Sequence, residues 1–171
     1  MARRIFLVQL FSFILCGCQN DDKAEPVPFT PIDLQEFSAN LKGFNLLGKF
    51  DVNWSNEGFA EEDFMMISDL GFNFARLPLD YLTYTKTGDW NTFLDDEIAE
   101  IDQAIQWGQK HGVHICISLH RAPGYSVNTS PIPANQQVNL WEDASAQDAF
   151  LNHWNFFCQS VQRYSQYPTK L

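Results

Sequence analysis

The stretch GFNFARLP, residues 71–78, together with the apolar run VHICISL at residues 113–119, decides how this chain folds. The second run is rich in β-branched residues, as a strand buried on both faces should be. We predict one strand over residues 72–77, stopped by Pro78, and another over residues 113–119 with His120 at its carboxyl end. This pattern is typical of a parallel sheet.

Longer amphipathic stretches alternate with the strands. They predict helices over residues 61–70, 95–110 and 144–164. Gly71 and Gly112 follow the first two, at the position where glycine commonly ends a helix. A first strand is predicted over residues 43–50, a loop passes through Gly88 and Trp90, and a second loop covers residues 121–139. Three strand-helix units in a row indicate an α/β fold.

Composition narrows the possible functions. The chain has 171 residues, of which 45% are hydrophobic, so it can bury a core. Its formal net charge is −10 and no Lys/Arg cluster follows the first few residues, which argues against a nucleic-acid partner. Aromatic residues make up 15% of the chain and suit either a large core or sugar-stacking surfaces. No metal-ligand spacing is present, and we expect no metal and no cofactor.

The amino terminus has the pattern of a lipoprotein signal peptide over residues 1–17. Arg3 and Arg4 precede an apolar run over residues 5–15, and the sequence Leu-Cys-Gly-Cys ends at Cys18. This resembles a bacterial lipobox, which implies a lipid anchor on Cys18 and an outer-membrane location facing the periplasm or the cell surface. A simple signal peptide cut nearby, or a chance cysteine pair, remains an alternative.

A flexible tether and a folded body are expected beyond the anchor. Residues 18–31 are polar and contain three prolines, which suits an extended tether, and residues 32–171 form the body. Cys116 lies in a strand pattern and Cys158 in a helix pattern. We expect two separate buried thiols, although the two could pair in an oxidising compartment.

Candidate functional residues lie where the predicted strands end. The carboxyl ends of parallel barrel strands and their loops carry the working groups of such folds. These residues are Asn45, Asp51 and Trp54 after the first strand, Arg76 at the second, and His120, Tyr125 and Asn128 after the third. We predict that they form a polar mouth edged by aromatic rings, while His111, His114 and His153 are surface or helix residues.

Three motifs in order resemble glycoside hydrolase family 5. They are GFNLLGKFD at residues 43–51, GFNFARLP at residues 71–78 and SLHRAPG at residues 118–124. The resemblance extends over about residues 41–171 and implies a (β/α)8 TIM barrel. Such a barrel needs about 250 residues, so we expect only its first three βα units in this chain.

The resemblance implies a role for two polar residues. Arg76 would hold the nucleophile carboxylate ionised, because its guanidinium is a fixed fork of donors. His120 would donate a hydrogen bond to sugar hydroxyls beside the reacting centre. The structural alternatives are a salt-bridged core arginine and a satisfied interior histidine.

The remaining candidates are more evenly balanced between structure and function. Asn45 could brace the first strand, and Asp51 could cap a turn. Trp54, Tyr125 and Trp141 could belong to the core or the rim, or stack on the apolar faces of pyranose rings.

The mechanism that the resemblance implies is retaining hydrolysis by two carboxylates about 5 Å apart. We expect both glutamates beyond Leu171, because the one Asn-Glu pair, Asn56-Glu57, follows the first strand and is misplaced for this role. We therefore expect no turnover from this chain. A three-stranded piece with open edges is also expected to be unstable alone, as in an interrupted reading frame.

Three functions fit these observations. The first is a hydrolase of β-glucan or a related polysaccharide, with no obligate protein partner. The second is a non-catalytic carbohydrate-binding surface lipoprotein, and the third is a different barrel enzyme. The linkage stays open, since residues 43–51 favour the cellulase branch and Ala122-Pro123-Gly124 favours exo-1,3 and endo-1,6 glucanases.

Overall fold

The computed structural model describes residues 40–126 and 137–165, with side chains as far as Ser160. All of these lie in the second of the two units, residues 1–32 and 33–171, into which the chain divides. The predicted signal peptide, the whole predicted tether over residues 18–31, and Asn128 lie outside the described residues. Of the helices in the described part, none is long and apolar enough to cross a bilayer.

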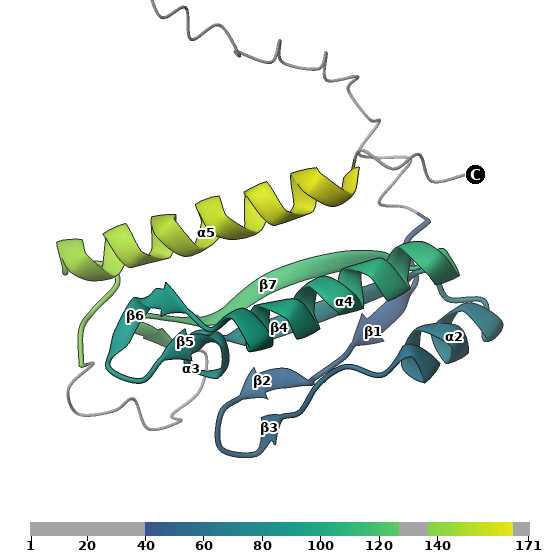
Figure 1. Cartoon of the computed structure of the whole chain (residues 1–171), viewed down its shortest axis with the longest axis horizontal. Coiled ribbons are helices and arrows are strands. Elements are labelled where there is room, and N and C mark those ends of the chain that lie inside the picture. The colour runs from purple at the N-terminus through teal and green to yellow at the C-terminus, as the bar shows by residue number, and fades with distance from the viewer. Residues whose placement is uncertain (1–39, 127–136, 166–171) are drawn as a thin grey trace, which may run out of the picture. The chain divides into compact units, whose positions relative to one another are not determined.

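A parallel sheet forms the centre of the described unit (Figure 1). Its strands are β1 (Gly43–Asn45), β4 (Phe74–Asp80) and β7 (His114–Ala122), which lie side by side in chain order, and β8 (Tyr125–Ser126) pairs antiparallel with the end of β7. Each new parallel strand is added next to the one before it. This order is that of a barrel that grows in one direction, and it lacks the reversal of a doubly wound sheet.

The predicted helices are confirmed with small changes at their ends. They are α2 (Glu61–Asp69), α4 (Asp95–His111) and α5 (Ala144–Ser165). Gly71 and Gly112 adopt the left-handed conformation, with φ of 77° and 70°, and so end α2 and α4 as predicted.

The first predicted strand is divided. The sheet strand β1 stops at Asn45, and β2 (Lys49–Asp51) pairs instead with β3 (Ser55–Asn56) in a separate hairpin. A turn comes between them, because the Phe50 amide donates to the Leu47 carbonyl. The prediction of one strand over residues 43–50 was therefore wrong in length.

Charged side chains explain why β2 leaves the sheet. The Lys49 ammonium is 2.5 Å from a Glu97 oxygen and 2.6 Å from a Glu100 oxygen at the start of α4, with only 3% of its side chain exposed. Burial opposes the charge, but the hydrogen bonds that the ammonium donates to Glu100 and Glu97 hold the pKa of Lys49 above its ordinary value. An ammonium without these partners would be too costly to bury.

The loop predicted through Gly88 and Trp90 contains regular structure. It consists of α3 (Tyr81–Tyr84) and a hairpin of β5 (Thr85–Lys86) and β6 (Asp89–Phe93). The Asp80 side chain caps α3 by accepting from the Leu82 amide at 3.0 Å.

Pro78 does not stop the second strand, which continues to Asp80. The Arg76 carbonyl accepts from the Leu46 amide on the β1 side. Because backbone groups alternate sides along a strand, Pro78 also faces that side, two residues beyond the end of β1. Its missing N–H removes no bond to a neighbour, so proline is tolerated there.

The third strand is longer and less buried than predicted. β7 continues through His120 to Ala122, and residues 115–120 are only half-buried. Within the described residues, the edge of β7 away from β4 pairs only with β8. The expectation of burial on both faces was therefore wrong in the described structure.

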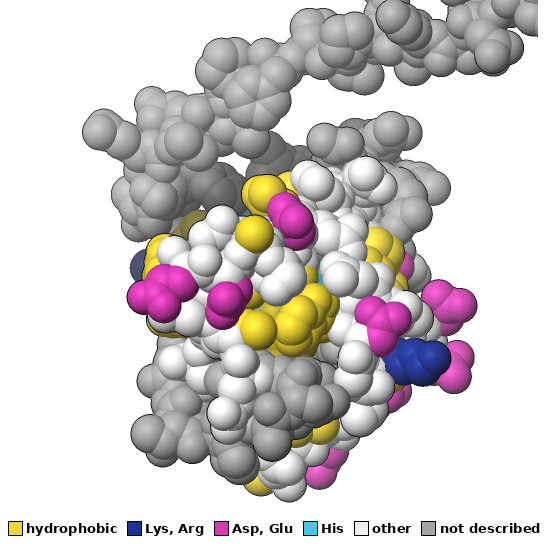
Figure 2. Space-filling view, turned by 90° about the vertical axis from the view of Figure 1, so that its left-hand side faces the viewer, with side chains coloured by type: hydrophobic (Ala, Val, Ile, Leu, Met, Phe, Trp, Pro, Cys, Tyr) yellow, Lys and Arg dark blue, Asp and Glu magenta, His cyan; other side chains and the backbone are white. Residues whose placement is uncertain are grey.

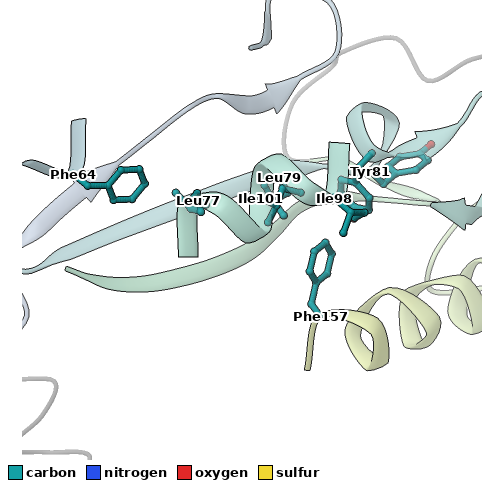
Figure 3. Close-up of a cluster of buried hydrophobic side chains, with 9 residues drawn as sticks. Phe64, Leu77, Leu79, Tyr81, Ile98, Ile101 and Phe157 are labelled. Carbon is teal, nitrogen blue, oxygen red and sulfur yellow. The ribbon is translucent and has the colours of Figure 1, made fainter. Parts of the chain in front are cut away.

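The hydrophobic core lies between the helices and one face of the sheet (Figure 3). Leu77 and Leu79 of β4 are fully buried and pack in one cluster with Phe64 of α2, Ile101 of α4 and Phe157 of α5. β7 contributes alternate residues to the same cluster, namely Ile115, Ile117 and Leu119. The opposite face of the sheet is therefore left for polar side chains.

The two cysteines do not pair. Cys116 and Cys158 are both free thiols, which confirms that they are separate. Cys116 is half-buried and Cys158 is exposed, so the prediction that both are buried was wrong. Cys158 lies on the exposed side of an amphipathic helix, and its side chain therefore faces away from the core.

His153 is a fully buried residue of α5, not a surface residue. One ring nitrogen, Nε2, lies 2.6 Å from the Trp90 carbonyl, and the other, Nδ1, lies 3.1 Å from the Tyr84 hydroxyl. Because a carbonyl only accepts, Nε2 carries the proton and Nδ1 accepts from Tyr84, which is the neutral tautomer. Burial lowers the pKa of His153, partly offset by the bond to Trp90.

We expect acid to destabilise the fold through His153. A histidine with a lowered folded pKa binds its proton more readily in the unfolded chain. The stability that neutral His153 contributes to the folded state is complete above about pH 6.5, and it is lost as the pH falls below that value. Urea unfolding from pH 7.5 to 5 should show a fall in stability that is weaker in His153→Gln, where an amide can still donate to Trp90. Parallel pH curves for the two proteins would contradict this.

Candidate functional site

Five side chains form the polar face of the sheet. The strand register places Asn45 of β1, Arg76 of β4 and Cys116 of β7 next to one another. Since side chains alternate along a strand, Ser118 and His120 lie on the same face as Cys116. We define the polar face as Asn45, Arg76, Cys116, Ser118 and His120.

Arg76 and His120 are in direct contact on this face. One guanidinium nitrogen of Arg76, Nη2, lies 2.7 Å from Ser118 Oγ and 3.3 Å from His120 Nδ1. Arginine has donors only, so Nδ1 of His120 must accept. The Nε2 atom of His120 therefore carries the proton and is a hydrogen-bond donor.

His120 is held in its neutral form. Burial lowers the pKa of His120, and the positive charges of Arg76 and Arg121 lower it further. At neutral pH the face therefore offers one cationic fork and one neutral N–H donor. Such a set suits hydroxyl and carboxylate groups.

Aromatic rings continue from His120 to the surface. The Phe50 ring centroid lies 4.8 Å from that of His120 and 5.3 Å from that of Trp54, with an edge-to-face angle of 67° to Trp54. Trp54 is 62% exposed. Of the alternatives for Trp54, the structure excludes a core position and places it at the rim.

A second aromatic pair lies beyond the end of β7. Tyr125 of β8 and Trp141 have ring centroids 6.4 Å apart in an edge-to-face arrangement. Tyr125 is 38% exposed and Trp141 is 76% exposed, so both are rim residues and neither belongs to the core.

Asp51 is not part of the polar face. It lies in β2, is 2% exposed, and its Oδ2 is 2.7 Å from Nη2 of the buried Arg121. The expectation of Asp51 at the end of the first strand was wrong, because the chain turns before it. Its Oδ1 also accepts from the Asn53 amide at 2.9 Å, as in the turn cap that was its structural alternative.

Asn45 lies beside Arg76 in register and is exposed. The bracing role considered for it belongs to another residue, Asn73, which sequence reasoning missed. Asn73 Oδ1 accepts from the Lys42 amide at 2.8 Å, and its Nδ2 donates to the Asn40 carbonyl at 3.1 Å. Asn73 thus holds the beginning of β1 against β4.

Sequence reasoning also missed four residues around the polar face. They are Phe50, Asp80, Ser118 and Arg121. Ser118 could have been found from the alternation of side chains, since it precedes His120 by two positions. Asp80 lies in the part of β4 beyond Pro78, where the sequence predicts no strand, and no sequence pattern pairs Asp51 with Arg121.

The side of the molecule with β6 and the start of α5 faces the viewer in Figure 2. Hydrophobic side chains gather near the middle of this view, and acidic side chains lie around them. Among the residues that the structure describes, no group of three or more His, Cys, Asp or Glu residues could hold a metal ion. The carboxylates around this apolar surface disfavour the binding of a polyanion there.

Comparison with known proteins gives the family. Residues 32–171 match the model of the cellulase family, glycosyl hydrolase family 5. The chain is 27% identical over 127 residues to Endoglucanase C of Acetivibrio thermocellus, covering 72% of this chain and 35% of that protein. It is 28% identical over 95 residues to a glucan 1,3-beta-glucosidase of Candida oleophila, covering 56% of this chain and 22% of that protein.

A solved structure confirms the fold. A crystal structure of a glycoside hydrolase superposes with a TM-score of 0.60 at 30% identity, over 69% of this chain and 36% of that one. The three parallel strands and their helices thus form the first units of a (β/α)8 barrel, as the sequence predicted. The chain spans about a third of the length of the first relatives it matches. By the match over residues 32–171, this chain belongs to the cellulase family, glycosyl hydrolase family 5.

Proposed function

We propose that this protein acts in the hydrolysis of β-glucan, and that the polar face contacts the sugar at the reacting centre. The observation that carries the proposal is the contact between Arg76 and His120, on adjacent parallel strands of a family 5 barrel. The fixed donors of Arg76 suit a carboxylate, and the Nε2–H of His120 suits a sugar hydroxyl. Trp54 offers an exposed ring for stacking on a pyranose.

The polar face supplies donors but no carboxylate. Retaining hydrolysis needs an acid/base and a nucleophile about 5 Å apart. We propose that residues beyond Leu171 supply both carboxylates and that Arg76 holds the nucleophile ionised. The 171-residue chain would then bind β-glucan oligosaccharides without cleaving them.

Both parts of this proposal are testable with the full chain. Cellotetraose and laminaritetraose should shift the NMR signals of the His120 ring and the Trp54 indole, while a reducing-sugar assay shows no hydrolysis. Absence of any shift by either sugar would count against the polar face as a sugar site. Comparing the two sugars also tests the linkage, which is open because the matched relatives include both an endoglucanase and a glucan 1,3-beta-glucosidase.

The gene distinguishes a hydrolase from a non-catalytic binding protein. Reading the DNA beyond the Leu171 codon should reveal a frame that encodes an Asn-Glu pair soon afterwards. A genuine stop codon at that point would favour a carbohydrate-binding lipoprotein in place of an enzyme.

We also propose that the protein is an outer-membrane lipoprotein anchored through Cys18. The support is the order of features in residues 1–18, in which two arginines are followed by an apolar run and then by Leu-Cys-Gly-Cys. In a bacterial host, labelled fatty acid should be incorporated into the wild-type chain and not into Cys18→Ser, whereas Cys16→Ser should still be labelled. Labelling of Cys18→Ser would contradict the assignment.

A further inference from the structure

A β-bulge in β7 lies at His120. Leu79 pairs with Leu119, but the next residue of β4, Asp80, pairs with Arg121. His120 is therefore an extra residue, with no partner of its own in the register with β4. Bulges change the direction of side chains and occur often beside active sites.

The bulge changes the side on which Arg121 lies. In a regular strand Arg121 would alternate with His120 and point to the core face, where Leu77 and Leu79 are fully buried. With the bulge, Arg121 instead faces the side chain of its partner Asp80. Both His120 and Arg121 consequently contact Phe50, with the His120 ring centroid 4.8 Å from the Phe50 centroid and the guanidinium carbon of Arg121 5.0 Å from it.

A buried ion cluster holds this arrangement. Arg121 Nη1 is 3.2 Å from Asp80 Oδ2 and donates to the Phe50 carbonyl at 2.5 Å, while Nη2 is 2.7 Å from Asp51 Oδ2. The side chains of these three charged residues are at most 3% exposed. We define Arg121, Asp51 and Asp80 as the Arg121 cluster.

The partners of the cluster come from separate parts of the chain. Asp51 is on the hairpin that carries Trp54, whose amide donates to the Asp51 carbonyl at 3.3 Å. Arg121 Nε donates to Ser126 Oγ at 3.3 Å on β8, the strand that carries Tyr125. The cluster therefore connects both aromatic rims to the bulge.

We propose that Arg121 is a positioning residue, which through Asp51 and Asp80 fixes the bulge and so directs His120 toward the sugar. This inference rests on the proposed sugar site but not on hydrolysis. Arg121 touches no sugar, and it acts through the bulge at His120 and through Phe50. Without the cluster, Arg121 no longer holds the bulge or Phe50, so the His120 ring loses the orientation in which it contacts Arg76.

The test compares three forms of the full chain. They are Arg121→Met, the triple variant Arg121→Met with Asp51→Asn and Asp80→Asn, and Ile101→Ala as a control. Ile101 is fully buried on the core face, so its truncation lowers stability without touching the cluster. The triple variant removes the unpaired carboxylates that Arg121→Met leaves buried.

Two measurements are made on each folded form. Nitrogen NMR of the His120 ring reports which nitrogen carries the proton, and titration with cellotetraose and laminaritetraose reports affinity. We expect Arg121→Met and the triple variant to lose the pure Nε2–H form and to bind at least tenfold more weakly. Ile101→Ala should keep the wild-type ring signals and bind within twofold of wild type.

Recovery of both readouts in the triple variant would overturn the proposal, since the cluster would then serve stability alone. Unchanged readouts in Arg121→Met would also overturn it. Where Arg121→Met does not fold, the triple variant provides the same comparison. If the wild-type chain binds neither sugar, the proposed function fails, and the ring signals alone decide whether Arg121 positions His120.

Discussion

Replacement of Gly43 by alanine is expected to abolish pairing of β1 with β4. A Cβ at this position would lie 1.7 Å from the Phe74 carbonyl oxygen, which is a backbone atom and cannot move aside alone. The two residues are partners in the register, so relief of the clash requires separation of the strands. We expect Gly43→Ala to lower the free energy of unfolding by more than about 4 kcal/mol, a loss in the exceptional range for one substitution.

Gly58→Ala is the matched control for this effect. The three atoms nearest its added Cβ all belong to the Glu100 carboxylate, at the end of a side chain, and the nearest lies at 3.3 Å. Urea unfolding followed by circular dichroism should place Gly58→Ala within about 0.5 kcal/mol of the wild type, as for most surface changes. A stability loss for Gly43→Ala no larger than that of Gly58→Ala would show that the strands are not so closely spaced.

Replacement of Arg76 by methionine should have the largest effect on sugar binding. It removes the guanidinium charge, the hydrogen bond to Ser118 and the donor to His120 Nδ1. Without that donor, His120 has no fixed tautomer. A hydrogen bond from a charged group contributes about 1.5–3 kcal/mol, so we expect oligosaccharide affinity to fall by roughly a hundredfold, with 1.4 kcal/mol for each factor of ten.

Two further variants distinguish the planar geometry of the guanidinium group from its positive charge. Arg76→Lys keeps the charge but not the planar fork, so it should restore little affinity. Lys110, in the last turn of α4, is 63% exposed and paired with Glu61 of α2. Lys110→Met removes this cation and should leave binding unchanged. Calorimetric titration with cellotetraose and laminaritetraose provides the measurement. An equal loss in Arg76→Met and Lys110→Met would mean that net charge alone matters.

Much of the fold followed from local sequence. Hydrophobic periodicity placed α2, α4 and α5, and Gly71 and Gly112 ended the first two helices where expected, because a left-handed residue is a local need that glycine meets. The order of the strands followed from alternation of strand and helix. Arg76 and His120 could also be placed on adjacent strands, because parallel strands bring equivalent ends together.

Strand boundaries were less predictable. The sequence predicts a strand end at Pro78 because proline lacks the N–H that would bond to a neighbouring strand. The neighbour on that side is β1, and it ends before it reaches Pro78, so no bond is lost. The first strand was read as continuous because residues 43–50 are largely apolar, whereas Lys49 needs carboxylates that lie on α4. Both errors concern partners that are distant in sequence.

The sequence by itself determined the family motifs, the helices and the polar residues available to a site. Only the tertiary structure decided that Asp51 is buried against Arg121, that His153 is in the core, and that His120 lies in a bulge. The reason is physical. A buried charge or a bulge is stable only where its partners meet. Those partners lie far apart along the chain, with separations from 28 positions for Val52 and Asp80 to 71 for Phe50 and Arg121.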